Sequence, residues 1–222
     1  MSEEKENTNT AIFIVLFIVV ILSIAAVIFL RSEGEKEIPN TIEGRLLAVI
    51  EGDLPEDLGY LYNDAYPFII LDDFWYTQVQ SPKGTNLFQV SFRYGPHQLE
   101  DIPIEGAFDG TLFDSSPEWY ITFDPDGGDF TYVSLAVSDF DSMMVKVFSK
   151  RPVAACTNTN DKACEDRPII TCENEDVPVV YFRVSNETGV FLENNCIILS
   201  GREFDIVKST DRFLLNVLGI ME

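Results

Sequence analysis

The most suggestive chemical motif in the sequence is a run of carboxylates and glycines at residues 124–129, Asp-Pro-Asp-Gly-Gly-Asp. Asp124, Asp126 and Asp129 supply the hard oxygen ligands that Ca²⁺ prefers. The spacing departs from an EF-hand loop, because Gly128 stands at the third ligand position and no glutamate closes the loop. Proline, aspartate and glycine are also the residues that form β-turns. We therefore expect a hairpin turn joining two strands, with a calcium site as the alternative.

Histidine-based catalysis would have to use His97, because it is the only histidine in the chain. His97 lies beside Gly95 and Pro96, where we expect a loop at the surface. No GxSxG sequence surrounds a serine, and neither standard Gly-rich phosphate loop is present. The sequence thus favours a surface position for His97 over a catalytic one.

Pairs of acidic residues could carry out the acid–base chemistry of a hydrolase. The pairs are Asp72–Asp73, Asp139/Asp141 and Glu105/Asp109. With 37 acidic residues in the chain, such pairs arise by chance. We therefore predict that the chain is not an enzyme and needs no cofactor, and we keep a carboxylate-based hydrolase as the alternative.

All four cysteines, Cys156, Cys164, Cys172 and Cys196, lie in the last third of the chain. None forms a CxxC pair, so thioredoxin-type exchange and zinc-ribbon binding lack their close-spaced ligands. An even number of cysteines in a tethered domain indicates two disulfides and an oxidising compartment. Of the three connectivities, we favour Cys156–Cys164, which closes a polar loop, and Cys172–Cys196, which joins two strands. Buried thiols and metal ligation are the alternatives.

The elements that must position these residues follow a long apolar run at residues 11–30, which contains no charge, proline or glycine. As a helix, the run spans about 30 Å, the thickness of the hydrocarbon core of a bilayer. Residues 1–10 are acidic and no small-residue cleavage site follows the run, so we predict an uncleaved signal anchor. Residues 31–40 form a charged linker.

The composition is strongly acidic, with 37 Asp and Glu against 15 Lys and Arg and a net charge of −22. This charge excludes nucleic acid as a natural partner and opposes docking on anionic lipid. The basic residues that flank the apolar run lean slightly towards a cytoplasmic domain. The cysteines favour the opposite orientation, with the N-terminus inside and residues 31–222 extracytoplasmic.

Short apolar runs with turn residues between them recur along residues 41–150, which we expect to form a β-rich domain. The predicted strands include residues 68–71, 87–94, 118–124, 130–137 and 143–149. Their spacing is typical of an antiparallel β-sandwich or meander.

Residues 151–222 predict a disulfide-bonded, β-rich module with strands at 177–184 and 195–201. The module ends in one helix, from about residue 203 to Gly219. Asn186 begins the one full glycosylation sequon, in a predicted turn. The expected fold class is mainly β, α+β overall.

Several segments resemble uncharacterised, membrane-anchored archaeal envelope proteins. The segments are RPVAAC (151–156), IITC (169–172), VPVVYFRV (177–184), NCIILSG (195–201), DRFLLNVLGIM (211–221) and FRYGPHQLEDIP (92–103). That family has no assigned activity or catalytic residues, so the resemblance implies only a location. We therefore expect a structural or interaction component of a cell envelope, whose partners are other envelope or membrane proteins. An accessory subunit of a membrane complex is the alternative.

Overall fold

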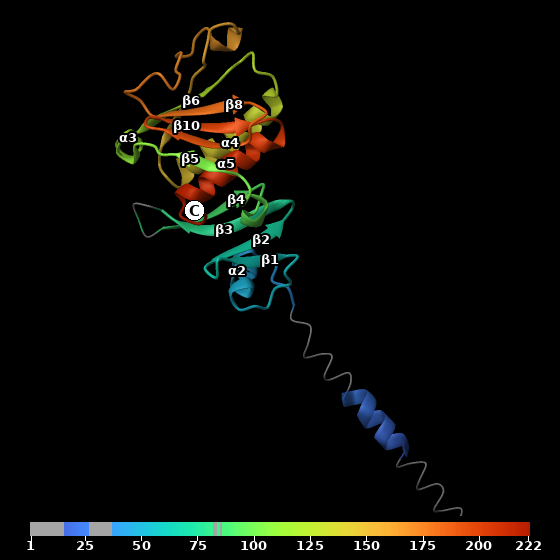
Figure 1. The fold of residues 1–222 in the computed structure, drawn as a ribbon. Coiled ribbons are helices and arrows are strands. Elements are labelled where there is room, and N and C mark those ends of the chain that lie inside the picture. The colour runs from blue at the N-terminus through green and yellow to red at the C-terminus, as the bar shows by residue number, and fades with distance from the viewer. Residues whose placement is uncertain (1–15, 27–36, 82–83, 85) are drawn as a thin grey trace, which may run out of the picture. The chain divides into compact units, whose positions relative to one another are not determined.

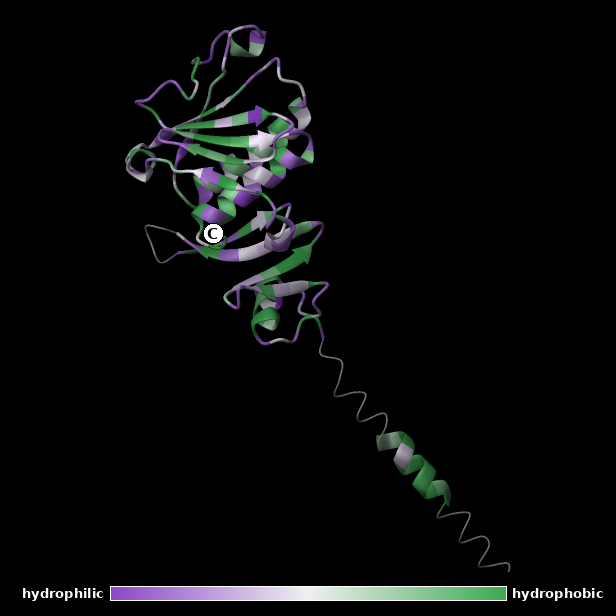
Figure 2. Cartoon of the chain, in the orientation of Figure 1, coloured by the Kyte–Doolittle hydropathy of each residue, from purple (hydrophilic) through white to green (hydrophobic). Residues whose placement is uncertain are grey.

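The computed structural model describes residues 16–26, 37–81, 84 and 86–222, and it divides into residues 1–40 and residues 41–222 (Figure 1). In the first unit, residues 16–26 form a helix whose side chains are exposed and which is hydrophobic along most of its length (Figure 2). None of the described helices is long and apolar enough to cross a membrane.

The rest of the predicted anchor, residues 11–15 and 27–30, lies outside the described residues. The predicted tail, residues 1–10, and residues 31–36 of the predicted linker lie outside them as well.

The second unit is α+β and contains two sheets. Its first half contains α2 (Ile42–Ile50), β1 (Gly59–Tyr62), β2 (Tyr66–Leu71), β3 (Phe74–Gln80), β4 (Leu87–Phe92), η1 (Pro96–Gln98), β5 (Ile104–Gly106) and α3 (Gly110–Ser115). Its second half contains β6 (Glu118–Phe123), α4 (Phe130–Lys146), β7 (Arg151–Ala154), η2 (Lys162–Cys164), β8 (Val179–Val184), β9 (Gly189–Glu193), β10 (Cys196–Gly201) and α5 (Phe204–Val217).

The four-stranded sheet is an antiparallel meander in which the order β1-β2-β3-β4 follows the chain. Its tight turns use residues that tolerate positive φ, such as Asn63 at 50° and Asp73 at 65°. One face packs on the main core through Phe68 and Phe92. Ile69, the neighbour of Phe68, points to the other face and packs against α2. A meander is therefore present, but it ends at Phe92 and does not extend through residues 93–150 as predicted. Helix α2 packs on the face that carries Ile69.

The six-stranded sheet is mixed, with the order β5-β9-β10-β8-β6-β7. Only β9 and β10 pair antiparallel, and the other neighbours are parallel. Parallel neighbours need crossover connections, and α4 provides one between β6 and β7. This sheet differs from the antiparallel arrangement predicted from the sequence, because the strand spacing carries no information about pairing direction.

Helices α4 and α5 pack against each other and connect the two sheets, since α5 contacts β10 and α4 contacts both β8 and β4 (Figure 1). The strands of the larger sheet alternate between two apolar faces, as a strand buried on both sides must. Val180 and Phe182 join the core beneath the helices, whereas Val179 joins a cluster on the opposite face. A loop that contains Cys172 covers this opposite face.

The prediction of strands at residues 130–137 and 143–149 is wrong, because both segments belong largely to helix α4. The buried residues of α4 recur at three- and four-residue spacing, as one helical face requires. They are Val133, Ala136, Phe140, Met143 and Met144. The β-branched residues favoured strands, but burial of this helical stripe between the sheets decides the structure. The expected α+β class is therefore confirmed, but helix and strand contents are about equal, so the fold is not mainly β.

The C-terminal helix is present as α5, and Gly219 follows its end with φ of 71°, which is typical of the residue after a helix. The domain boundary expected between residues 150 and 151 falls inside one compact unit. Strands β6 and β8 come from the two sides of that boundary and are neighbours in one sheet.

Candidate functional site

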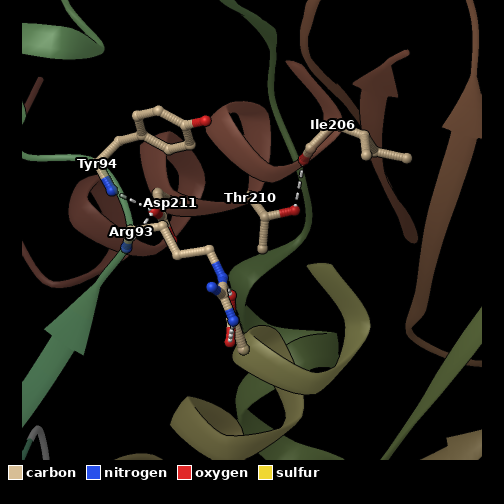
Figure 3. Close-up of polar contacts among 6 residues, drawn as sticks. Arg93, Tyr94, Ile206, Thr210 and Asp211 are labelled. Atoms are coloured by element: carbon tan, nitrogen blue, oxygen red, sulfur yellow. Dashed lines mark hydrogen bonds and ion pairs between the residues drawn. The ribbon is translucent and has the colours of Figure 1, made fainter. Parts of the chain in front are cut away.

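Among the described residues, the most buried ionisable side chain outside the disulfides is that of Asp211 on α5, which is 1% exposed. It lies where the four-stranded sheet meets the layer formed by α4 and α5. Its Oδ2 accepts hydrogen bonds from the backbone N–H groups of Arg93 and Tyr94, both at 2.9 Å (Figure 3). The Arg93 guanidinium in turn contacts both carboxylate oxygens of Asp139 on α4, with Nε at 2.6 Å and Nη2 at 3.4 Å. We call these four residues the interlayer junction, because they connect the end of β4 to α4 and α5.

Burial raises the pKa of Asp211 to about 8, and the nearby Asp139 carboxylate adds to the effect. The two backbone N–H donors and the Arg93 charge act in the opposite direction, since they stabilise the ionised form. Burial therefore favours the protonated form of Asp211 over a wider pH range in the folded protein than in the unfolded chain. The carboxyl group is almost closed to solvent, and the hydrogen bonds that it accepts connect the end of β4 to α5.

The predicted disulfide connectivity is confirmed. Cys156 pairs with Cys164 across a Cα–Cα distance of 5.9 Å, and Cys172 pairs with Cys196 across 5.2 Å. Cys196 begins β10 with its side chain on the sheet face opposite the helices, so its disulfide attaches the covering loop to that face. The Asn195 amide reinforces the attachment, because its Nδ2 donates to two carbonyl groups of the same loop, at 3.2 and 3.0 Å.

The Asp-Pro-Asp-Gly-Gly-Asp segment is a turn, but it joins β6 to helix α4 rather than to a strand, so the hairpin prediction is wrong. Its carboxylates face different partners. Asp124 Oδ1 accepts from Asp126 N at 3.0 Å and from Asn158 Nδ2 at 3.1 Å, while Asp129 Oδ2 lies 3.5 Å from Arg202 Nε. Among the described residues no group of three or more potential ligands is arranged to hold a metal ion. The calcium alternative therefore gains no geometric support from these three residues.

His97 lies in the short helix η1 with its side chain 59% exposed. The imidazole stacks on Tyr60 with ring centroids 4.4 Å apart, and Nδ1 lies 2.8 Å from Glu100 Oε1. Tyr60 Oη meanwhile accepts from the His97 backbone N–H at 3.5 Å. The imidazole is therefore held in place by packing against Tyr60, at the edge of the meander.

The three acidic pairs occupy separate structural positions. Asp72 and Asp73 form the exposed β2–β3 turn, and Asp109 caps α3 by accepting from two of its backbone N–H groups. Asp139 and Asp141 are two positions apart on α4, so their side chains point in different directions. Burial raises the pKa of Asp141 to about 6, and its Oδ1 has no hydrogen-bond partner in the described part of the chain.

The predicted glycosylation sequon lies in the turn between β8 and β9, as expected, and Asn186 is exposed. Asn186 Oδ1 accepts from Arg202 Nη1 at 3.1 Å. A glycan at this position would therefore project from the turn but would compete with that contact.

A cavity of about 330 Å³ lies where the ends of α4 and α5 approach α3. Its walls are mostly apolar, with Phe113, Trp119 and Met144 among the buried residues that line it. Lys150 also lines it, and Nζ donates to the carbonyl oxygens of Phe113, Asp114 and Ser116 at 2.8, 2.7 and 2.7 Å. Lys150 thereby satisfies carbonyl groups that the end of α3 leaves without helical partners.

Sequence reasoning missed both the interlayer junction and this cavity. The signal for the first was present, because Asp211 and Arg212 stand inside the apolar stripe of α5, between Val207 and Leu214. A charged pair in a buried stripe indicates a specific polar partner. The cavity left no such signal, since its lining comes from separate parts of the chain.

Comparison with protein-family models, with curated proteins and with solved structures found no match for the chain.

Proposed function

We propose that the chain is a single-pass, membrane-anchored protein with its N-terminus inside and residues 31–222 outside, where it is a structural or interaction component of the cell envelope. The observation that supports this most is the pairing of all four cysteines. Disulfides persist in oxidising compartments and are rare in a reducing cytosol. Neither pair has the close spacing of a redox-active CxxC motif.

The anchor is supported by the described part of the apolar run. Residues 16–26 are helical and their large apolar side chains are exposed, for example Phe17 at 67% and Leu22 at 63%. A helix that is apolar on all sides requires lipid or protein around it. The complete run at residues 11–30 has the length and composition to enter a bilayer.

An interaction role is favoured over hydrolysis by the way the acidic candidates are used. Asp109 caps a helix, Asp139 pairs with Arg93 and Asp72 lies in an exposed turn. The disulfides instead constrain a loop, residues 155–178, on the face of the six-stranded sheet opposite the helices. A fixed loop surface suits recognition of another protein, because little conformational entropy is lost on binding.

Copurification from native membranes tests this function. The full chain, tagged at its C-terminus, is crosslinked in cells, purified, and compared with the Cys156→Ala/Cys164→Ala variant, in which the loop is less constrained. We expect other envelope proteins to be recovered with the unmodified chain and at least several-fold less with the variant. Recovery of one membrane complex in fixed stoichiometry would favour an accessory subunit. Recovery of nothing above a mock purification would contradict the interaction role.

A further inference from the structure

The cavity beside α3 has the size and lining of a small-molecule site. Its volume of about 330 Å³ lies at the lower end of the range for ligand pockets. An apolar cavity of about 150 Å³ accepts benzene, so this volume corresponds to roughly two rings. Aromatic side chains form much of the wall, and Phe113 makes edge-to-face contacts with Phe108 at 5.1 Å and Trp119 at 4.7 Å.

The walls are formed without a ligand. Phe113, Trp119 and Met144 are all at most 6% exposed and belong to the main core. Trp119 is also oriented by a hydrogen bond from Nε1 to the carbonyl of Phe113, at 3.0 Å. Because these side chains are already ordered, a ligand that enters the cavity loses little free energy to rearrangement of the protein.

The charged residues in the lining determine which ligand charge the cavity can accommodate. The three N–H donors of the Lys150 ammonium already have three carbonyl acceptors, and its Nζ lies 5.9 Å from the centre of the Trp119 ring, so an anion in the cavity could bind Lys150 directly only by breaking one of these hydrogen bonds. The other ionisable residue of the lining is the exposed Asp114. An anion would therefore gain no unused hydrogen-bond donor from Lys150 and would be repelled by the Asp114 carboxylate, in a chain of net charge −22.

We propose that this cavity binds a neutral apolar molecule about the size of two fused rings. The inference goes beyond the envelope role, which requires no small ligand. The ligand ring packs against Phe108, Phe148 and Val217, the half-buried apolar residues of the lining, and the buried Phe113 and Trp119 support this surface from behind. Met144, a flexible and polarizable side chain that is 1% exposed, lies in the wall behind this surface, where its methyl group senses a ligand in the cavity.

The test uses the full chain in lipid nanodiscs, with 2-naphthol as the probe and ¹³C-methyl methionine as the label. Met144 lines the cavity, whereas its neighbour Met143 does not, so the two methyl groups separate site binding from partition into lipid. We expect a saturable shift of the Met144 signal with little change at Met143. The matched anion, 2-naphthoate, should bind at least tenfold more weakly.

Val217→Trp fills the cavity and should weaken binding of 2-naphthol at least tenfold. Val145→Trp is the matched control, because Val145 is 56% exposed on α4 and lies outside the lining. If Val217→Trp does not fold, Phe148→Ala removes part of the wall instead and should also weaken binding. The proposal is overturned if the Met144 shift does not saturate, if Met143 shifts equally, or if a folded cavity variant binds as well as Val145→Trp.

Discussion

The two sheets of the second unit differ in how far apart their paired strands lie along the chain. The four-stranded sheet pairs each strand with the next one along the chain, through short turns. Apart from the β9–β10 hairpin, the six-stranded sheet pairs strands that are far apart in the chain, with α4 and the loop at residues 155–178 among the connections. Both disulfides lie in this part of the chain. Local pairing costs little loop-closure entropy, whereas long crossovers cost more. The crosslinks therefore occur where the chain has the largest entropy to lose.

Each sheet contains one of the two tryptophans, Trp75 in β3 and Trp119 in β6. The variants Trp75→Phe and Trp119→Phe consequently report on one sheet each. The following predictions use these probes in denaturant unfolding, with both probes read in the same buffer.

The largest effect is expected from the disulfides. Cys172→Ala/Cys196→Ala should lower the free energy of unfolding by about 3.5 kcal/mol, and Cys156→Ala/Cys164→Ala by about 2.5 kcal/mol, since the shorter loop loses less entropy in the unfolded chain. The order of the two variants is the critical result. A smaller effect of the Cys172–Cys196 pair would contradict the chain-entropy explanation for the second sheet.

The interlayer junction is expected to have the next largest effect. Asp211→Ala leaves two buried N–H groups without their acceptor and should cost about 2 kcal/mol. Asp211→Asn keeps an acceptor oxygen and resembles the protonated acid, so at pH 7 its stability should stay within about 1 kcal/mol of the unmodified chain. Equal losses in the two variants would show that the hydrogen bonds to β4 do not couple the sheets.

The pH dependence of stability should reveal the raised pKa values of Asp211, about 8, and Asp141, about 6. Both groups keep their protons to higher pH in the folded state than in the unfolded state, so their stabilisation is complete below about pH 4. It is lost as the pH rises towards 8. The free energy of unfolding should therefore fall between pH 5 and pH 8, and Asp211→Asn should flatten this slope. An unchanged slope in that variant would assign the pH effect to other groups.

The smallest effect is expected where the meander contacts the end of α5. Tyr66 Oη donates to the Gly219 carbonyl at 2.8 Å, so Tyr66→Phe should cost about 1 kcal/mol. Tyr76→Phe, on the sheet face that packs towards α2, is the matched control. Thermal unfolding of both variants gives the comparison. Equal decreases in Tm would show that the hydrogen bond from Tyr66 to Gly219 does not contribute to stability.

The same contrast explains what the sequence could predict. The strands of the meander follow from alternation, as in residues 87–94, because each pairs with a sequence neighbour. The parallel partners of β6 and β8 are not local, so no pattern in either strand specifies them. The strand prediction fails at α4 because each half of the helix is β-forming when taken alone, whereas the spacing of the buried residues from Val133 to Met144 is helical.

The candidate sites divide in the same way. The cysteine pairing could be inferred, since loop polarity and strand position favoured one connectivity of three. The junction partner of Asp211 could not, because the two residues that donate to it are more than 100 positions away along the chain. When two side chains meet only through tertiary packing, the sequence can indicate that one of them is buried, but it does not indicate which residue it contacts.

The most direct test of the account is the sidedness of the cysteines. Intact cells are treated with a membrane-impermeant thiol reagent, with and without an impermeant reductant, and the four cysteines are quantified by mass spectrometry. We expect no labelling without reductant and labelling of Cys156, Cys164, Cys172 and Cys196 after reduction, before the membrane is opened. Four free thiols that react only after the membrane is opened would place the domain in the cytoplasm and contradict the proposed envelope function.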